Sequence, residues 1–241
     1  MQFLYKPIKN QRQIGKKRPY SNIKWIVIHY TGNYSKGADA MAHYKYLQTA
    51  TRYGSAHYFV DDKQIIQVIG DSFVAWAVGD NQGHGKFLNG CNNSNSISIE
   101  MCVNSDSDQD KVYKNTLELT KNLMQKFKVP AERVCRHYDV SRKDCPHNMR
   151  ENNWSLWWRF KEDIKKPIEW KIDLSKNSGF GSDTKMENKT ETKKNHWAEK
   201  AWQDLKDKGI DIHEKRFDEP ITRGELFSLL DRFLEKLEKW N

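Results

Sequence analysis

The sequence predicts an α/β protein with a mixed central β-sheet flanked by helices and a small C-terminal helical hairpin. Over the first 165 residues, short apolar runs rich in β-branched side chains alternate with longer segments of helical periodicity. A segment poor in apolar residues follows, and a stripe of leucines at helical spacing ends the chain. A length of 241 residues accommodates one core of about 150 residues and one smaller unit.

The first predicted elements are a strand, a helix and a hairpin. Residues 23–28 are nearly all apolar, which predicts a central strand buried on both faces. Residues 38–48 have apolar side chains along one side of a helix. Residues 55–60 and 64–68 are rich in β-formers, and the polar residues 61–63 between them predict a hairpin.

A further strand and a long helix complete the predicted core. Residues 97–101 alternate strictly, so Ser98 and Glu100 share the face opposite the apolar side chains. The periodicity of residues 110–128 predicts a helix, and Pro130 ends it. Strands mixed with helices in this order favour a mixed sheet covered by helices.

Composition divides the chain into four predicted parts. They are a basic N-terminal extension (1–20), a globular domain (21–165), a linker (166–195) and a helical hairpin (196–241). Much of the linker is Ser, Thr, Asn, Gly and Lys, which is typical of flexible connections. The hairpin has about 46 residues, near the lower limit for an independent core.

Charge and hydropathy exclude some classes of protein. The chain has 41 basic and 32 acidic residues, a formal net charge of +9. This balance favours a polyanionic partner, namely nucleic acid, anionic lipid or a cell-wall polymer; a solvated basic tail is the alternative. No run approaches the ~18 apolar residues of a membrane span. The first residues carry charge where a signal peptide is apolar, so we expect synthesis in the cytoplasm without a signal peptide.

Two histidines and a cysteine form a candidate metal site. Four cysteines are too few and too irregular for a disulfide framework, so reduced thiols or a metal ligand fit better. His29 lies where the first buried strand emerges, and His137 and Cys145 lie close together later in the chain. Two imidazoles and one thiolate leave the fourth tetrahedral position open, as in catalytic zinc sites. The alternative is that these are ordinary surface or core residues.

Four segments carry a resemblance to a known family. In chain order they read WIVIHYTGN, SAHYFVDD, SISIEMC and CRHYDVSRKDCP. Together they resemble the zinc-dependent N-acetylmuramoyl-L-alanine amidases of the amidase-2 type, which share a fold with peptidoglycan recognition proteins. The likeness covers roughly residues 21–160 and is closest to endolysins of phages or prophages that infect Gram-positive hosts. It implies three zinc ligands: His29, His137 and Cys145.

The resemblance also implies a catalytic carboxylate at Glu100 and a catalytic cation at Lys143. Glu100 points off an alternating strand, so it can face a cleft, take a proton from water and return it to the leaving amine. Lys143 precedes Cys145 by two residues, and an extended backbone would place both side chains on one face. Its ammonium would then stabilise the oxyanion. A surface strand carboxylate and a solvated loop charge are the alternatives.

Two further sites are predicted. His57 lies where relatives carry His or Tyr, and it either contacts the substrate or packs behind the metal site. The segments HWAEKAWQDLKDKGI and ITRGE resemble a single S-layer homology repeat over about residues 195–238, a module that binds secondary cell-wall polymers. This resemblance implies that Trp197 and Arg223 face the polymer. An oligomerisation hairpin is the alternative.

The resemblance implies a peptidoglycan hydrolase of the endolysin or autolysin kind. It would cleave the amide between N-acetylmuramic acid and L-alanine by zinc-activated water, cause cell lysis, and act at the wall after release from the cytoplasm. Peptidoglycan is the expected substrate, an anionic wall polymer is a candidate second partner, and nucleic acid is not expected. The alternatives are a catalytically weak peptidoglycan-recognition module and a cytoplasmic muropeptide-recycling amidase.

Overall fold

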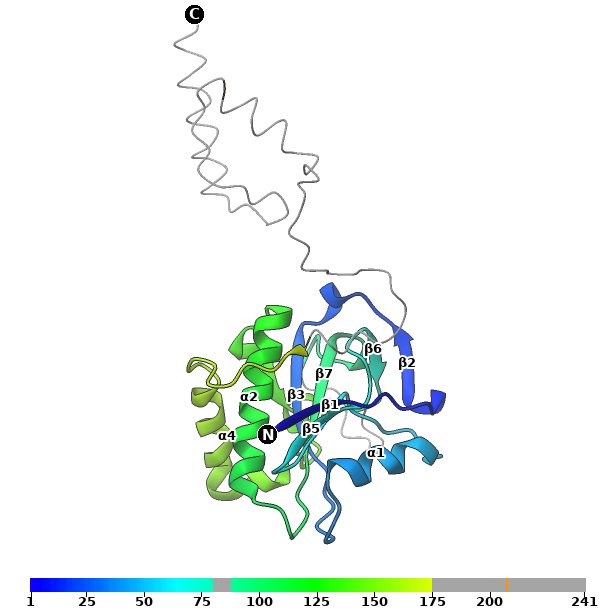
Figure 1. The fold of residues 1–241 in the computed structure, drawn as a ribbon. Coiled ribbons are helices and arrows are strands. Elements are labelled where there is room, and N and C mark those ends of the chain that lie inside the picture. Colours follow the sequence, from blue (N-terminus) through cyan, green and yellow to red (C-terminus); the bar gives the residue numbers. More distant parts are fainter. Residues whose placement is uncertain (80–87, 175–206, 208–241) are drawn as a thin grey trace, which may run out of the picture. The chain divides into compact units, whose positions relative to one another are not determined.

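The computed structural model describes residues 1–79, 88–174 and 207 (Figure 1). The chain divides into two units, Met1–Gly181 and Ser182–Asn241, and the fold described here belongs to the first. Within the described part of the chain, no helix is long and apolar enough to cross a membrane.

The predicted C-terminal hairpin, apart from Asp207, lies outside the described residues, and so do its two candidate polymer contacts, Trp197 and Arg223. Their proposed roles therefore stay predictions.

A six-stranded sheet forms the centre of the first unit. Its strands are β1 (Gln2–Tyr5), β5 (Gln64–Gln67), β4 (Tyr58–Val60), β7 (Ser96–Met101), β3 (Trp25–Tyr30) and β8 (Val134–Arg136), in this spatial order. Neighbouring strands pair in parallel, except that β4 and β5 form the predicted antiparallel hairpin. The prediction of a mixed central sheet is confirmed.

Helices cover both faces of this sheet. They are α1 (Ala40–Thr49), α2 (Gln109–Phe127), α3 (His137–Ser141) and α4 (Glu151–Asp163). Single turns of 3-10 helix lie at Gln11–Gln13, Tyr20–Asn22, Asn93–Asn95, Ala131–Arg133 and His147–Met149. α2 begins where the Asp108 side chain accepts a hydrogen bond from the Lys111 amide, and it ends at Lys128 in a left-handed conformation. It therefore matches the helix predicted for this segment.

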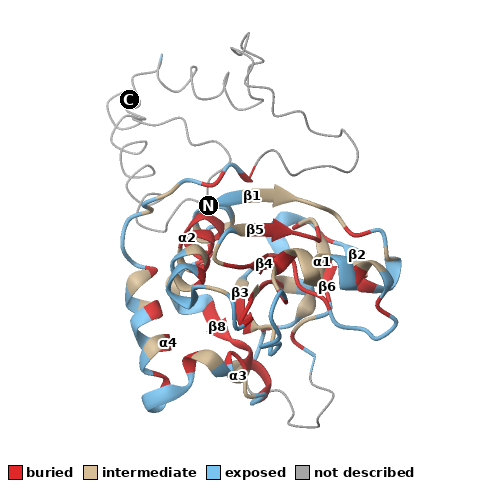
Figure 2. Ribbon diagram, turned by 60° about the horizontal axis from the view of Figure 1, so that its bottom comes forward, coloured by how far each residue is buried: buried red, intermediate tan, exposed pale blue. Residues whose placement is uncertain are grey.

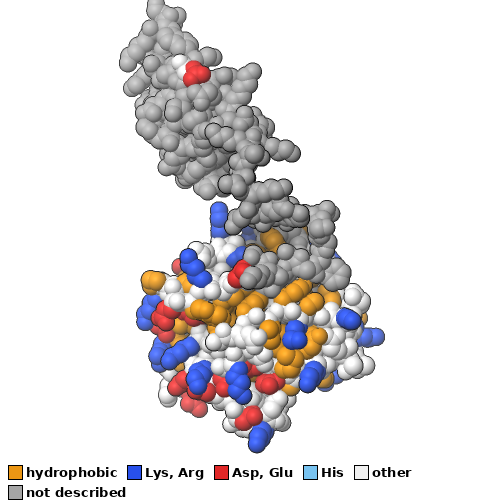
Figure 3. All heavy atoms as spheres, viewed as in Figure 1, with side chains coloured by type: hydrophobic (Ala, Val, Ile, Leu, Met, Phe, Trp, Pro, Cys, Tyr) orange, Lys and Arg blue, Asp and Glu red, His pale blue; other side chains and the backbone are white. Residues whose placement is uncertain are grey.

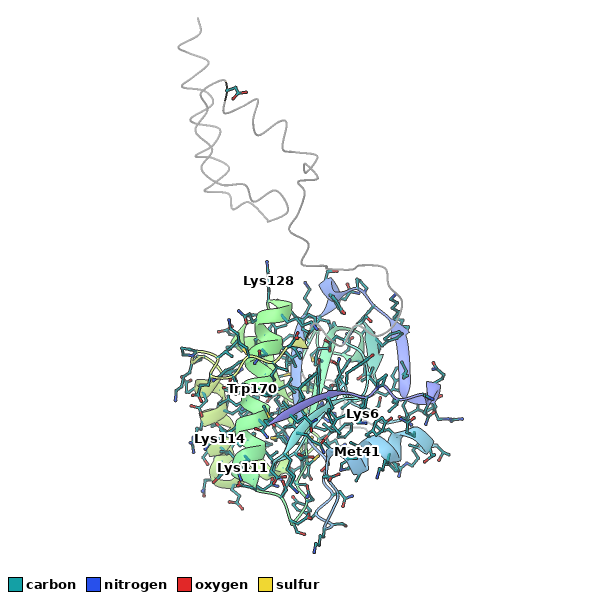
Figure 4. All side chains as sticks on the ribbon, in the orientation of Figure 1. Lys6, Met41, Lys111, Lys114, Lys128 and Trp170 are labelled. Atoms are coloured by element: carbon teal, nitrogen blue, oxygen red, sulfur yellow. The ribbon has the colours of Figure 1, made fainter. Side chains whose placement is uncertain are left out.

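The pleat of the strands divides the apolar side chains between two cores. Tyr58 and Val60 join the core beneath α2 and α4, whereas Phe59 between them joins the core beneath α1. In Figures 1 and 2, α2 and α4 lie beside each other and away from α1. Figure 4 labels a side chain that packs against each core, Trp170 for the first and Met41 for the second. Ile26, Val27 and Ile28 of β3 are all buried, so this strand is covered on both faces, as its continuous apolar sequence predicts.

The N-terminal segment differs from the predicted extension because it belongs to the globular unit. β1 extends the central sheet along β5, and β2 (Ile14–Lys17) pairs with β6 (Phe73–Ala75) in a second, two-stranded sheet. Strand pairing uses backbone groups, so a charged segment can add to a sheet while its charged side chains face solvent. On the face in Figure 3, basic side chains are spread among acidic and apolar ones.

The beginning of the predicted linker also packs on the globular unit. The Glu118 carboxylate on α2 accepts hydrogen bonds from the Glu169 and Trp170 amides, both at 3.0 Å. The Asn122 side chain accepts another from the Ile172 amide. Composition alone predicts that the backbone of this segment is solvated, but its amides donate hydrogen bonds to polar side chains of α2. The globular unit therefore extends past residue 166.

Candidate metal centre and substrate pocket

Two neighbouring parallel strands bring the candidate metal donors together. His29 lies within β3, and β8 ends at Arg136, so that His137 begins α3 beside it. Cys145 follows α3 in a loop, where its carbonyl accepts a hydrogen bond from the Tyr138 amide at 2.8 Å. Carboxyl ends of parallel strands meet at one edge of a sheet, and Figure 2 shows β3, β8 and α3 adjacent there.

The three donors form a compact buried cluster. Their ligand atoms lie within 4.8 Å of one another. The ring centroids of His29 and His137 are 4.7 Å apart, and the Cys145 sulfur lies 3.8 Å from His29 Nδ1. Tetrahedral zinc with such ligands would hold their atoms about 3.3–3.6 Å apart. Nε2 of His29 is buried without a hydrogen-bond partner, which fits a metal ligand better than a core histidine.

Electrostatics at this cluster also fit a bound cation. Burial lowers the pKa of His29, and the neighbouring His137 and Lys143 lower it further. Neutral imidazole is the form that binds metals. Burial raises the pKa of the Cys145 thiol, and the Glu100 carboxylate adds to this effect. A cation is therefore needed to hold the thiolate, as a zinc ion does for its cysteine ligands.

Glu100 and Lys143 line one pocket of about 200 Å³. Glu100 on β7 is opposite His29 on β3, which places the carboxylate next to the metal donors. Its Oε2 atom is buried and has no hydrogen-bond partner. Burial raises the pKa of Glu100 to about 8, although the Lys143 ammonium opposes the increase. The structure thus brings both predicted catalytic residues to one pocket.

The backbone around Lys143 differs from the extended form that the sequence led us to expect. The Cys145 amide donates a hydrogen bond to the Lys143 carbonyl at 2.8 Å, so these residues form a tight turn. The prediction of an extended backbone with both side chains on one face is therefore wrong for this segment. Lys143 reaches the pocket because the turn follows α3, a feature that the spacing of two residues does not reveal.

His57 is enclosed by protein groups on both sides of its ring. Nδ1 accepts a hydrogen bond from the Ser98 amide at 3.1 Å, so the ring proton lies on Nε2 and faces the Phe73 carbonyl. The Arg18 guanidinium lies 3.0 Å from Nε2. Both ring nitrogens are occupied within the protein, and this arrangement favours the packing role over a substrate contact. Arg18 could not be predicted as the partner of His57, because nothing near it in the chain signals this contact.

A buried site with two histidines and one cysteine, beside a pocket with a carboxylate and an ammonium, defines a candidate metal-dependent hydrolase on an α/β fold. The sequence profile of the N-acetylmuramoyl-L-alanine amidase family, amidase-2, matches residues 19–148, which is more than half of the chain. The chain belongs to this family.

Individual relatives agree with the family assignment. The N-acetylmuramoyl-L-alanine amidase CwlH of Bacillus subtilis strain 168 is 35% identical over 128 residues, which are 53% of this chain and 49% of CwlH. XlyA of the same strain, which carries the same enzyme name, is 35% identical over 140 residues, 58% of this chain and 43% of XlyA. The chain thus spans about half the length of the curated relatives that it matches.

Solved structures match about two thirds of the chain. The catalytic domain of XlyA superposes with a TM-score of 0.58 at 31% identity, covering 68% of this chain and 99% of that domain. PlyL superposes with a TM-score of 0.56 at 30% identity, covering 69% of this chain and 98% of PlyL. The likeness therefore extends over nearly the whole of each of these two structures.

Proposed function

We propose that this protein is a peptidoglycan hydrolase that cleaves the amide bond between N-acetylmuramic acid and L-alanine. The observation that carries the proposal is the buried cluster of His29, His137 and Cys145 next to the pocket of Glu100 and Lys143. The family of the chain and the enzyme names of its relatives support the same reaction.

Zinc is the metal that this donor set fits best. Two imidazoles and one thiolate are preferred zinc ligands, and three protein ligands leave one position for the reaction. When bound there, zinc supplies Lewis acidity, which polarises the scissile carbonyl and makes the attacking water more acidic.

The protein's own residues then move the protons and stabilise charge. Burial raises the pKa of Glu100 to about 8, whereas the charge of a metal bound at the neighbouring donors would lower it, so Glu100 is suited both to take a proton from the attacking water and to return it to the leaving amine. Lys143 has two effects: its ammonium lowers the pKa of Glu100 and can stabilise the oxyanion that forms on the attacked carbonyl. Because the Glu100 carboxylate is largely buried, its interaction with the Lys143 ammonium is stronger than it would be in water.

Digestion of purified Gram-positive peptidoglycan tests this function. New amino groups and new reducing ends are assayed separately, with and without a chelator, and the products are identified by mass spectrometry. We expect amino groups alone, lost on chelation and restored by zinc, with muramic acid freed from L-alanine. Reducing ends would indicate a glycosidase, and no product would indicate a recognition module.

We further propose that the protein acts as an endolysin at the cell wall after release from the cytoplasm, and that residues 196–241 anchor it to an anionic wall polymer. The resemblance to an S-layer homology repeat and the net charge of +9 support this role. Trp197→Ala and Arg223→Ala in the full chain should weaken co-sedimentation with whole walls while cleavage of soluble muropeptides stays unchanged. Unchanged sedimentation of both variants would contradict an anchor.

A further inference from the structure

The pocket beside the metal centre has polar atoms that the protein itself does not satisfy. Three side chains in its lining each have a buried polar atom without a hydrogen-bond partner: Thr31 Oγ1, His43 Nε2 and Glu100 Oε2. Burial of a polar atom without a partner is destabilising, so such atoms at a pocket are expected to meet a ligand. Glu100 has a role in the proposed reaction, whereas His43 on α1 has none.

The orientation and protonation of His43 follow from its contacts. Its ring stacks on Phe59 with centroids 5.2 Å apart and planes 6° apart. The ring also hydrogen-bonds the Ala38 backbone, and because Nε2 has no partner, Nδ1–H is the group that donates to Ala38. Burial lowers the pKa of His43, so the ring is neutral near pH 7. Nε2 consequently presents a lone pair, which is a hydrogen-bond acceptor.

Strand register locates His43 relative to the reacting bond. Phe59 on β4 is opposite Glu100 on β7, which in turn is opposite His29 on β3. Neighbouring strands are about 4.8 Å apart, so Phe59 lies about 10 Å from His29 across the sheet, with Glu100 between them. His43 stacks on Phe59 and is thus on the side of Glu100 away from the metal donors. It is suited to contact the substrate beside the scissile bond, not at it.

We propose that His43 is a substrate-positioning residue, whose Nε2 accepts a hydrogen bond from a neutral N–H or O–H donor next to the scissile amide. This inference rests on the proposed function, because it takes the pocket as the substrate site. Peptidoglycan offers such donors in two places, the amides of the stem peptide and the hydroxyls of the glycan. If this hydrogen bond is equally strong in the bound substrate and in the transition state, it strengthens substrate binding and leaves the rate of the chemical step unchanged.

Three variants separate the acceptor from the packing of the ring. His43→Phe keeps an aromatic ring for stacking on Phe59 and removes both nitrogens, whereas His43→Gln restores a side-chain acceptor. Lys45→Ala changes an exposed residue of the same helix and is the matched control. We expect His43→Phe to raise KM about 3- to 10-fold with kcat within about twofold, as for the loss of one hydrogen bond. His43→Gln should recover most of the loss, and the control should behave as the parent protein does.

Binding measured without turnover keeps this test separate from the reaction. Dissociation constants of muramyl peptides are measured by calorimetry for Glu100→Ala and for Glu100→Ala/His43→Phe. The ligands are N-acetylmuramoyl dipeptide, the same sugar with a longer stem, and a disaccharide with the dipeptide. If an added stem residue or an added sugar increases the affinity only in the protein that keeps His43, that added group carries the N–H or O–H donor. In nitrogen-15 spectra of the imidazoles, Nε2 of His43 should appear unprotonated and shift on binding.

The outcomes distinguish this inference from the proposed function. If muramyl peptides bind in a His43-dependent way but no amide is cleaved, the inference stands and the proposed reaction fails. If the amide is cleaved and His43→Phe binds every ligand as well as its parent, the inference fails alone. A protonated Nε2, or the absence of any muramyl-peptide binding, would also overturn it.

Discussion

The two sides of β7 bury polar side chains in different ways. On the side of the metal donors and the pocket, His29 and Glu100 each have a buried polar atom without a partner. Towards β2 and β6, most buried polar groups bond to one another: Arg18 donates to two backbone carbonyls, and Asp71 accepts hydrogen bonds from Tyr58 and Gln67, although Gln67 Oε1 has no partner. Buried polar groups that satisfy one another stabilise a fold, whereas unsatisfied ones beside a pocket indicate a ligand.

The largest expected effect is on the metal side. Cys145→Ala and His29→Ala should each abolish zinc binding and hydrolysis, because two donors do not complete the site. The metal-free variants should remain folded, because the replaced side chains make few hydrogen bonds within the protein: His29 Nε2 has no partner, and the Cys145 sulfur lies 3.8 Å from His29 Nδ1. Metal content by mass spectrometry, hydrolysis and thermal unfolding check these expectations. Full activity of a metal-free Cys145→Ala protein would exclude the metal assignment.

Glu100→Ala should keep zinc and lose about 10²-fold or more in turnover, because the group that moves protons is gone. Glu100→Gln is the matched variant, since it keeps the shape of the side chain and removes the base. Steady-state hydrolysis of a soluble muropeptide, together with metal content, checks both variants. Unchanged turnover in either one would remove Glu100 from the mechanism.

Arg18→Ala tests the satisfied side of the comparison. It removes hydrogen bonds to the Asp71 and Asn93 carbonyls and leaves these groups without their partner. We expect about 2–3 kcal/mol less free energy of unfolding in urea, with zinc content unchanged. Arg12→Ala, an exposed change in the same segment, should stay within about 0.5 kcal/mol. Equal stability of the two variants would show that residues 1–20 contribute little to the fold.

The smallest expected effect is that of Lys126→Met, on the same network. The Lys126 ammonium contacts the Asp71 carboxylate at 2.9 Å, but part of the lysine side chain is exposed. Asp71 keeps its hydrogen bonds from Tyr58 and Gln67, so we expect a loss of about 1 kcal/mol. Urea unfolding of this variant beside Arg18→Ala measures how the network shares its stability. If Lys126→Met lowers the free energy of unfolding more than Arg18→Ala does, Asp71 contributes more to the stability of this network than Arg18.

Local patterns predicted the elements that carry the site. The alternation of residues 97–101 placed Glu100 on a strand, and the apolar run before His29 placed that histidine at a central strand; the structure has both. The strand extends to Tyr30, so His29 lies within it instead of after it. These features were predictable because periodicity depends on neighbours in the chain.

His43 could not be predicted as a pocket residue, because helical periodicity gives only the face of α1 on which a residue lies and not what packs against that face. Its unpartnered nitrogen becomes visible only when β4, with Phe59, packs beneath the helix. The same limit applies to Glu118, whose partners are backbone amides of residues 169 and 170. No local sequence pattern predicts which backbone amide will donate a hydrogen bond to a carboxylate far away in the chain.

The sequence by itself predicted the central strands, the hairpin and the two helices α1 and α2, and it named the candidate metal donors, since these depend on local spacing and on the chemistry of each side chain. The tertiary structure alone decided that residues 1–20 add strands to the sheets, that a turn brings Lys143 to the pocket, and which buried polar atoms are satisfied. The physical reason is that hydrogen-bond partners far apart in the chain meet only through the path that the whole chain follows in the fold.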